Sequence, residues 1–460
     1  MLILFPFIYF LSFVWASKEI LKGDKSGMLL FFIFGLSIYT VSQSLAFELG
    51  LRSIISFMQP LKELLVLVVF GIAVWNYKGK FKLHFVDYII GAFFLYIVSY
   101  VFIPIGDYSF LERLNASKSI AFFAVIYATG RLFKPQEIFL SKYFHYILFV
   151  AVAAAIVLAY ELVTNTHLQT MTGYADFNFY LYDQEPSGNY GLTWTFETEN
   201  GFKRFASFFA NPLEHAAATL LALSVLAGLY TSDSNKLKLD LFGKIALLAT
   251  QFSVFFALSR ASMVSYFAMI YVYALVTGKK YILHTFHFGL IAIVIYFIFL
   301  ITNTDIYDFV VDTLTFRNAS SLGHVLEWVT GIEAMISKPL GLGLGSSGKV
   351  SGMLGLNVGG ENQFIIIGVQ AGFIAFFTYF LIQACLLWLP FRWINKLKGK
   401  ERKIAISLFL LKVGSIIPLL TADFESYIYI AYIGWFLSGL FISIISRKAK
   451  PQRKLEDAKN

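Results

Sequence analysis

Long hydrophobic runs follow one another along almost the whole chain, from Met1 to Ile445, with only short polar segments between most of them. Thirteen of these runs approach or exceed the roughly 17 residues that a helix needs to cross a bilayer. They lie at 1–16, 28–47, 55–76, 84–105, 116–133, 144–164, 209–230, 243–258, 260–278, 281–301, 363–389, 404–420 and 425–446. The pattern predicts an all-α polytopic integral membrane protein with a single transmembrane domain, 1–446, and a basic tail, 447–460.

The composition excludes several classes of protein. Hydrophobic residues make up 58% of the chain and charged residues only 14%, which rules out a soluble enzyme. The single cysteine, Cys385, cannot form a disulfide within the chain or contribute to a multi-cysteine metal site. A net charge of +9 would be compatible with binding of nucleic acid. In a polytopic protein, however, the side of the membrane on which the basic residues lie indicates the orientation of the chain.

The basic residues are distributed unevenly between the two sides of the predicted membrane domain. If the first connection is cytoplasmic, 26 of the 37 Lys and Arg residues fall on the cytoplasmic side. This asymmetry predicts a cytoplasmic C-terminus and an N-terminus outside. The first residues, MLILFPF, lack the basic segment of a signal peptide, so we expect no cleavage there. We interpret the tail as a positive anchor near anionic headgroups, and nothing in it favours nucleic acid.

Two long connections, 165–208 and 302–362, both fall outside in this topology. The first is rich in aromatic and acidic residues, which fits either a glycan-binding surface or a cap whose rings lie at headgroup level. Within the second, the pattern predicts a short amphipathic helix over 322–337. Loops of this length are usually functional, so the working surface is expected to be extracytoplasmic.

The first polar cluster at an outer helix end combines Arg204 with the sequence Asn211-Pro212-Leu213-Glu214-His215. Its ordinary interpretation is a helix start, with asparagine as the N-cap and proline in the first turn. That interpretation explains neither Arg204 nor His215. His215 is therefore a candidate for substrate binding, and Asn211 is kept as a second candidate beside its capping role.

The second cluster is Ser259-Arg260-Ala261-Ser262, in a short hairpin between two hydrophobic runs. An arginine in the first turn of a helix opposes the helix dipole unless an anion is near. Arg260 therefore either reaches the outer headgroups or forms an anion site with the free N–H groups of the helix start.

The third and fourth clusters lie around the second long connection. Gly323 to Trp328 contains His324 and precedes the glycine-rich stretch Pro339 to Gly345. No strand and crossover helix frame these glycines, so they are weak evidence for a nucleotide site. Glu361-Asn362-Gln363 opens the longest late helix, where a carboxylate also stabilises the helix by itself. His324 on its own is as well explained by a structural role.

In order and spacing, the four clusters resemble motifs of the bacterial O-antigen polymerase and O-antigen ligase family. The resemblance covers about 204–375 and rests on these residues: Arg204, Phe208, Asn211 and Pro212; Ser259, Arg260 and Ala261; Gly323 to Trp328; Pro339 to Gly345; and Glu361, Asn362 and Gly372. The family resemblance implies a glycosyltransferase of the bacterial inner membrane that uses polyprenyl-diphosphate-linked glycans. It implies that Arg204 and Arg260 bind diphosphate, and that Glu361 acts as a base or orients the acceptor.

Two positions depart from the family pattern. Ligases carry a histidine where this chain has Glu361, and many members carry an arginine at His324. The first departure favours polymerase over ligase. The expected reaction therefore transfers a glycan from a polyprenyl diphosphate to a hydroxyl of a second lipid-linked repeat unit, outside the cytoplasm, with Asn211, His215, His324, Asn362 and Gln363 as substrate-binding residues.

We expect no cofactor and no metal, because the two arginines can take the place of a divalent ion and the outer loops show no metal-ligand motif. Expected partners are the lipid-linked oligosaccharide, the bilayer and, through the resemblance, a chain-length regulator and a flippase. Two alternatives remain open: an O-antigen ligase that uses lipid A-core as acceptor, and a lipid-linked oligosaccharide flippase or transporter. Lys412, inside a predicted helix, keeps the transporter alternative open.

Overall fold

A computed structural model describes residues 2–78, 81–300, 319–349, 351 and 357–448 of the protein. Within these ranges the chain is helical and forms no strand, apart from three isolated β-bridges. Ten helices among them are long and apolar enough to cross a membrane. The predicted all-α polytopic fold is thereby confirmed, whereas the count of thirteen spans stays a prediction.

The N-terminal half begins with α1 (Leu4–Leu21) and a helical segment from Lys25 to Glu48 that contains short 3-10 and π turns. The segment ends in α3 (Tyr39–Glu48). The next elements are α4 (Arg52–Met58), α5 (Leu61–Trp75), α6 (Phe85–Phe102), α7 (Phe110–Ala121), α8 (Phe123–Arg131), α9 (Leu140–Thr164) and α10 (Tyr174–Tyr182). The single run predicted at 116–133 is therefore divided between α7 and α8, which meet at a turn at Phe122.

The second half contains α11 (Pro212–Tyr230), α12 (Leu241–Phe256), α13 (Arg260–Thr277), α14 (Lys280–Leu300), α16 (Ala319–Ser337), α17 (Gln363–Trp393), α18 (Gly399–Thr421) and α19 (Ile428–Lys448). The helix predicted over 322–337 is confirmed as the greater part of α16. Most of the predicted basic tail, and residues 301–318 of the second long connection, lie outside the described residues.

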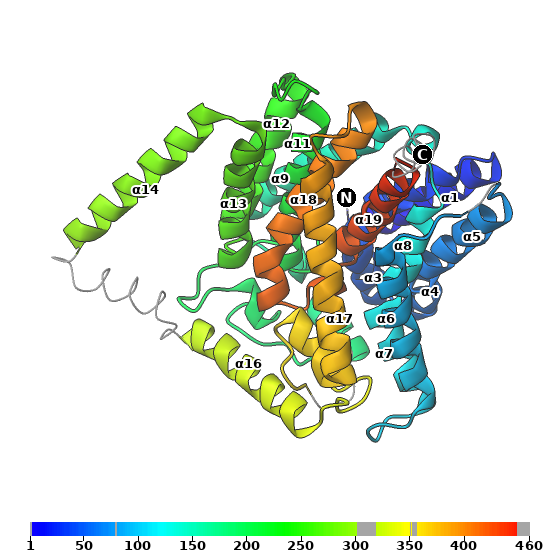
Figure 1. Ribbon diagram of the computed structural model, residues 1–460. Helices are drawn as coiled ribbons and strands as arrows, with labels where there is room; N and C mark the ends of the chain where they lie inside the picture. Colours follow the sequence, from blue (N-terminus) through cyan, green and yellow to red (C-terminus); the bar gives the residue numbers. More distant parts are fainter. Residues whose placement is uncertain (1, 79–80, 301–318, 350, 352–356, 449–460) are drawn as a thin grey trace.

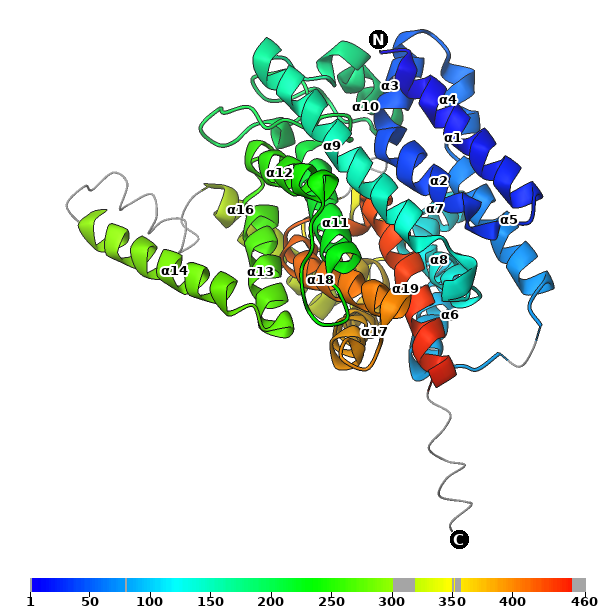
Figure 2. The ribbon, with the colours of Figure 1, turned by 90° about the horizontal axis from the view of Figure 1, so that it is seen from above.

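Two helices form the centre of the molecule. α11 and α19 are hydrophobic on all sides and almost completely buried, as expected for helices surrounded by other helices. α11 packs against α18, and α19 packs against α8 (Figure 2). The outer helices α1 and α6 instead leave many apolar side chains exposed, which in a membrane protein face lipid.

The loops divide between two ends of the molecule. The α11–α12 and α17–α18 connections lie at the same end as the C-terminus, at the top of Figure 1. The long connections that precede α11 and α17 lie toward the opposite end, together with α16. The four polar clusters singled out in the sequence therefore belong to one end of the molecule, which we call the loop end.

Glycines fix the shape of the loop end. α17 is broken at Ala371 and Gly372, and the glycine-rich loop packs into this break, where Leu342 N–H donates to Val369 O at 2.7 Å. Gly343 has φ +105°, and a Cβ there would lie 2.0 Å from Ile105 O. The glycines are therefore needed for close backbone packing.

Candidate functional site

Arg204 is held by an ordered loop. Its backbone N–H donates to Phe196 O at 2.8 Å, beside an isolated bridge between Glu197 and Lys203. The loop is tied to the end of α9 by the buried Glu161, whose two carboxylate oxygens accept from Leu168 N and Ser207 N, each at 2.8 Å. Because its backbone is fixed at both sides, the loop presents Arg204 in a defined place.

Arg260 is the first residue of α13. The preceding Ser259 is the N-cap, and its hydroxyl accepts from Ser262 N at 3.4 Å. The Arg260 guanidinium lies 3.8 Å from Glu199 Oε1, a carboxylate of the loop that carries Arg204. Both side chains are partly exposed, so this ion pair is weak enough to give way to a stronger anion.

His324 and Glu361 form a close pair. His324 Nδ1, on α16, lies 2.5 Å from Glu361 Oε2, in the segment just before α17. A second contact joins the same two segments, since Gly360 N–H donates to Glu327 Oε2 at 3.1 Å. α16 therefore positions the Glu361 carboxylate.

Arg204, Arg260, His324 and Glu361 line one cavity of about 570 Å³, which we call the arginine cavity. Other residues of its wall include Glu199, Trp328 and Tyr427. The four charged or titratable groups come from four separate parts of the chain, and the fold brings them to a common space.

The two arginines affect one another. Burial lowers the pKa of Arg204, the nearby Arg260 lowers it further, and Glu199 acts in the opposite direction. A guanidinium stays protonated in spite of such shifts. The pair is therefore a preformed cationic site whose mutual repulsion an incoming anion would relieve.

The other predicted substrate-binding residues do not line the arginine cavity. Asn211 caps α11 by accepting from Glu214 N at 2.9 Å, and Asn362 caps α17 by accepting from Phe364 N at 3.0 Å. His215 is buried and stacks on Phe209, with Nδ1 3.2 Å from Phe205 O. These contacts show how the fold holds the three side chains, and their role in substrate binding stays a prediction.

Gln363 also lies elsewhere. Its side-chain oxygen accepts from Glu425 N at 2.8 Å, which ties the start of α17 to the connection between α18 and α19. Gln363 and Asn211 both line a separate cavity between α5, α7, α11 and that connection.

Two parts of the cavity walls were missed by sequence reasoning. Tyr427 lies in the short connection between α18 and α19, and it lines the arginine cavity together with Pro418 and Thr421 from the end of α18. The charged residues of the separate cavity, Lys62 and Lys118 among them, had only a weak signal, namely a charge within or beside an apolar run. Nothing in the sequence indicates that the α18–α19 connection, or the charged residues of the separate cavity, lie near the four clusters.

Comparisons with known proteins give no family for this chain. No protein-family model matches it, and no curated protein matches it. Across the ranges that the structure describes, no group of three or more His, Cys, Asp or Glu side chains is placed to hold a metal ion. The functional argument therefore depends on the cavities themselves.

Proposed function

We propose that the protein is a bacterial polysaccharide polymerase. It transfers a glycan from a polyprenyl diphosphate to a hydroxyl group of a second lipid-linked repeat unit, on the extracytoplasmic side of the inner membrane. The observation that carries the proposal is the shared cavity of Arg204, Arg260, His324 and Glu361 at the loop end. The distribution of Lys and Arg favours placing this end outside and the C-terminus in the cytoplasm.

The arginines supply the electrostatic part of the mechanism. When the bond between the anomeric carbon and the diphosphate oxygen breaks, the diphosphate leaves with the electron pair. Fixed cations at the leaving oxygen stabilise this developing charge more than they stabilise the bound substrate. Arg204 and Arg260 are held by the loop and by α13 before the substrate arrives, so little reorganisation is required.

The Glu361 carboxylate is the proton acceptor. The acceptor hydroxyl attacks the anomeric carbon, and its proton passes to Glu361 while the polyprenyl diphosphate departs. His324, 2.5 Å from Glu361 Oε2, orients the carboxylate and shares the resulting charge. No cofactor is needed for these steps, since the energy of the lipid diphosphate bond drives the transfer.

Reconstitution tests the proposed function. Purified protein in lipid vesicles is given a lipid-linked repeat unit, and the products are separated by size. We expect longer glycans on the lipid carrier, with protein-free vesicles as the control. Transfer to added lipid A-core without elongation would indicate a ligase, and translocation of an unchanged repeat unit would indicate a flippase; either result contradicts the proposal.

A further inference from the structure

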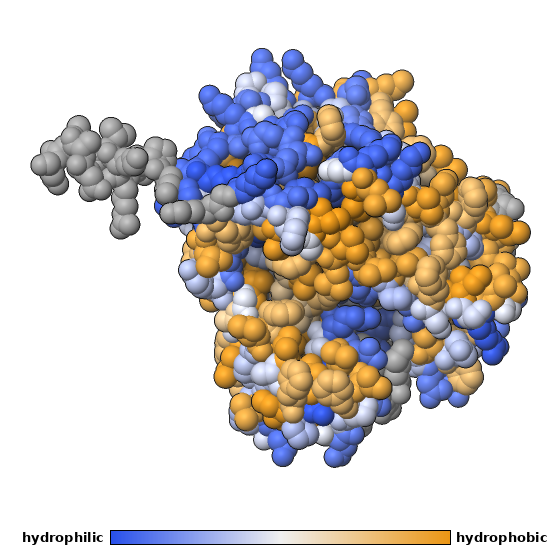
Figure 3. Space-filling model, turned by 90° about the vertical axis from the view of Figure 1, so that its right-hand side faces the viewer, coloured by the Kyte–Doolittle hydropathy of each residue, from blue (hydrophilic) through white to orange (hydrophobic). Residues whose placement is uncertain are grey.

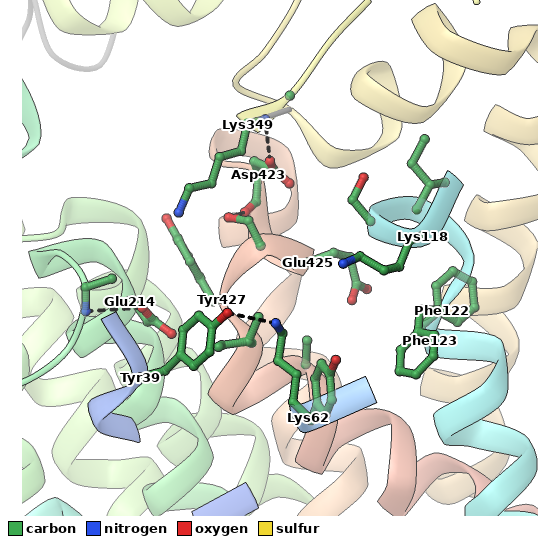
Figure 4. Close-up of a pocket in the computed structure, with 18 of the residues that line it drawn as sticks. Tyr39, Lys62, Lys118, Phe122, Phe123, Glu214, Lys349, Asp423, Glu425 and Tyr427 are labelled. Carbon is green, nitrogen blue, oxygen red and sulfur yellow. Dashed lines mark hydrogen bonds between the residues drawn. The ribbon is translucent and has the colours of Figure 1, made fainter. Parts of the chain in front are cut away.

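The second cavity at the loop end is charged although it lies among apolar helices. It has a volume of about 230 Å³ and is lined by α5, α7, α8 and α11, by the glycine-rich loop and by the connection between α18 and α19. Its cations are Lys62, Lys118 and Lys349, so we call it the lysine cavity (Figure 4). The proposed transfer step uses none of these residues.

The three lysines are placed differently. Lys62 is buried at the wall, where its ammonium contacts Tyr39 Oη at 2.9 Å, Gln59 O at 2.8 Å and Glu63 Oε1 at 3.2 Å. Lys118 contacts Glu63 Oε1 from the other side at 3.3 Å, and half of its side chain is exposed. In Figure 4, Lys349 reaches down from the loop at the top and Lys118 reaches in from α7 at the right.

Four carboxylates line the cavity, Glu63, Glu214, Asp423 and Glu425, and the last two have hydrogen-bond donors of their own. Glu425 accepts from Tyr379 Oη at 2.5 Å and from Trp435 Nε1 at 2.8 Å, and Asp423 accepts from Lys349 N at 3.0 Å. Burial raises the pKa of both carboxyl groups. Lys118 shares the Glu63 carboxylate with Lys62, so one negative charge faces two ammonium groups. The Lys349 ammonium lies 4.8 Å from the centroid of the Tyr182 ring. Lys118 and Lys349 are therefore the cations that we assign to a ligand.

Two helices of the cavity wall, α5 and α7, belong to a largely hydrophobic side of the molecule. α5, α6 and α7 lie on the right of Figure 1, and Figure 3 shows that side as a largely hydrophobic surface with a hydrophilic hollow in its lower half. A polar opening within a hydrophobic surface fits a ligand whose tail stays in lipid while its head group enters the protein.

The lysine cavity and the arginine cavity adjoin. Tyr427 lines both of them, and α11 contributes Leu213 to one wall and Glu214 to the other. Two head groups bound in the two cavities would therefore meet at Tyr427. Elongation of a lipid-linked glycan requires such a pair of substrates.

Resting on the proposed function, we infer that the lysine cavity binds the diphosphate of the second lipid-linked glycan, with Lys118 and Lys349 as its main ligands. The arginine cavity then holds the diphosphate of the glycan that is transferred. An ammonium group suits this role because it binds phosphate oxygens as a mobile point charge.

Native mass spectrometry of the protein in phosphatidylcholine nanodiscs tests the inference, with unglycosylated undecaprenyl diphosphate as the probe. We expect wild-type protein to bind a second molecule of the probe at higher concentration. Arg260→Ala should remove one binding event, and the double variant Lys118→Ala, Lys349→Ala should weaken the other by about tenfold or more. The matched control is Lys134→Ala, because Lys134 is equally exposed and also pairs with a glutamate, Glu137, outside both cavities.

Three results would overturn the inference. The first is a single binding event that Arg260→Ala removes and that the double lysine variant does not change. This result would not contradict the proposed function. The second is a lysine-dependent event for which phosphatidylglycerol competes equally, since the cavity would then hold an ordinary lipid head group. The third is no binding at all by wild-type protein, which would remove support from the proposed function as well.

Discussion

The pair of guanidinium groups at the loop end is the residue-scale feature on which the mechanism depends. Arg204 lies in a loop and Arg260 opens a helix, yet both line one cavity and each lies near Glu199. Two guanidinium groups in one cavity form a cationic site that suits an anionic ligand. The diphosphate of a lipid-linked glycan provides two phosphates for the two arginines.

Glu361→Gln tests the role of the carboxylate. The amide keeps the size of the side chain but cannot accept a proton, so we expect the rate of elongation to fall by about 10²- to 10⁴-fold. Binding of undecaprenyl diphosphate should change little, and Glu361→His should recover part of the rate. The measurement is elongation in reconstituted vesicles.

The control for this variant is Glu333→Gln, since Glu333 is an exposed residue of α16 outside the arginine cavity. Elongation by Glu361→Gln at the rate of the control would show that Glu361 is not the proton acceptor.

At the residue scale the sequence predicted part of the site. Arg204, Arg260, His324 and Glu361 could be chosen because each interrupts or flanks an apolar run, and the structure places all four in one cavity. His215 fulfils the same criterion but is buried against Phe209. The direction in which a side chain points depends on its neighbours in space, and the sequence pattern does not supply it.

The break in α17 is the feature that matters most at the scale of elements. The glycine-rich loop hydrogen-bonds to the backbone exposed by this break, and Gln370 joins it from the helix, accepting from Gly345 N at 2.8 Å and donating to Ser347 O at 3.0 Å. Tyr96 and Tyr100 of α6 donate to Ala371 O and Leu340 O. The same packing positions the segment that carries Glu361 and Lys349.

Gly343→Ala and Gly372→Ala test this packing. Both residues have positive φ, and an added Cβ would lie within 2.2 Å of a backbone oxygen. Strain of this kind costs about 1–3 kcal/mol per residue, so we expect a clear fall in the thermal unfolding midpoint of the purified protein. Gly91→Ala in α6 is the matched control, since nothing lies within 4 Å of its added Cβ. Equal midpoints for all three variants would contradict the structural role of the glycines.

The sequence predicted these elements to different degrees. The apolar runs predicted the ten long apolar helices, and the amphipathic pattern predicted α16. The turn that separates α7 from α8 was missed, because the apolar run continues through Phe122 without a proline or glycine. The glycines between Pro339 and Gly345 gave only weak evidence for a nucleotide site. Their packing against α17 joins segments that are distant in the sequence, so no local pattern predicts it.

The distribution of charge predicts the orientation of the whole molecule. Lys and Arg are concentrated in the connections at the end that carries the C-terminus, whereas both cavities lie toward the loop end. Hydropathy and charge together predicted the polytopic fold. They could not predict the cavities, since each is built from several segments spread over more than two hundred residues of the chain.

Cysteine labelling tests this orientation. In a Cys385→Ala background, we expect Asn200→Cys to react with a membrane-impermeant maleimide on intact cells whose outer membrane has been made permeable. Lys398→Cys should react only after the inner membrane is disrupted. Both positions are exposed, so accessibility to reagent depends on the side of the membrane. The opposite labelling pattern would place the arginine cavity in the cytoplasm.

Elongation by Arg260→Ala shows whether the guanidinium groups stabilise the departing diphosphate. One charge contact at about 4 Å contributes up to roughly 4 kcal/mol at an effective dielectric near 20, so we expect the rate to fall by about 10²- to 10³-fold. Protein levels in the membrane should stay unchanged. The control is Arg52→Ala, which removes an arginine packed over Phe47 and Tyr180, outside the arginine cavity. Polymer of wild-type length, formed at the wild-type rate by Arg260→Ala, would contradict the account.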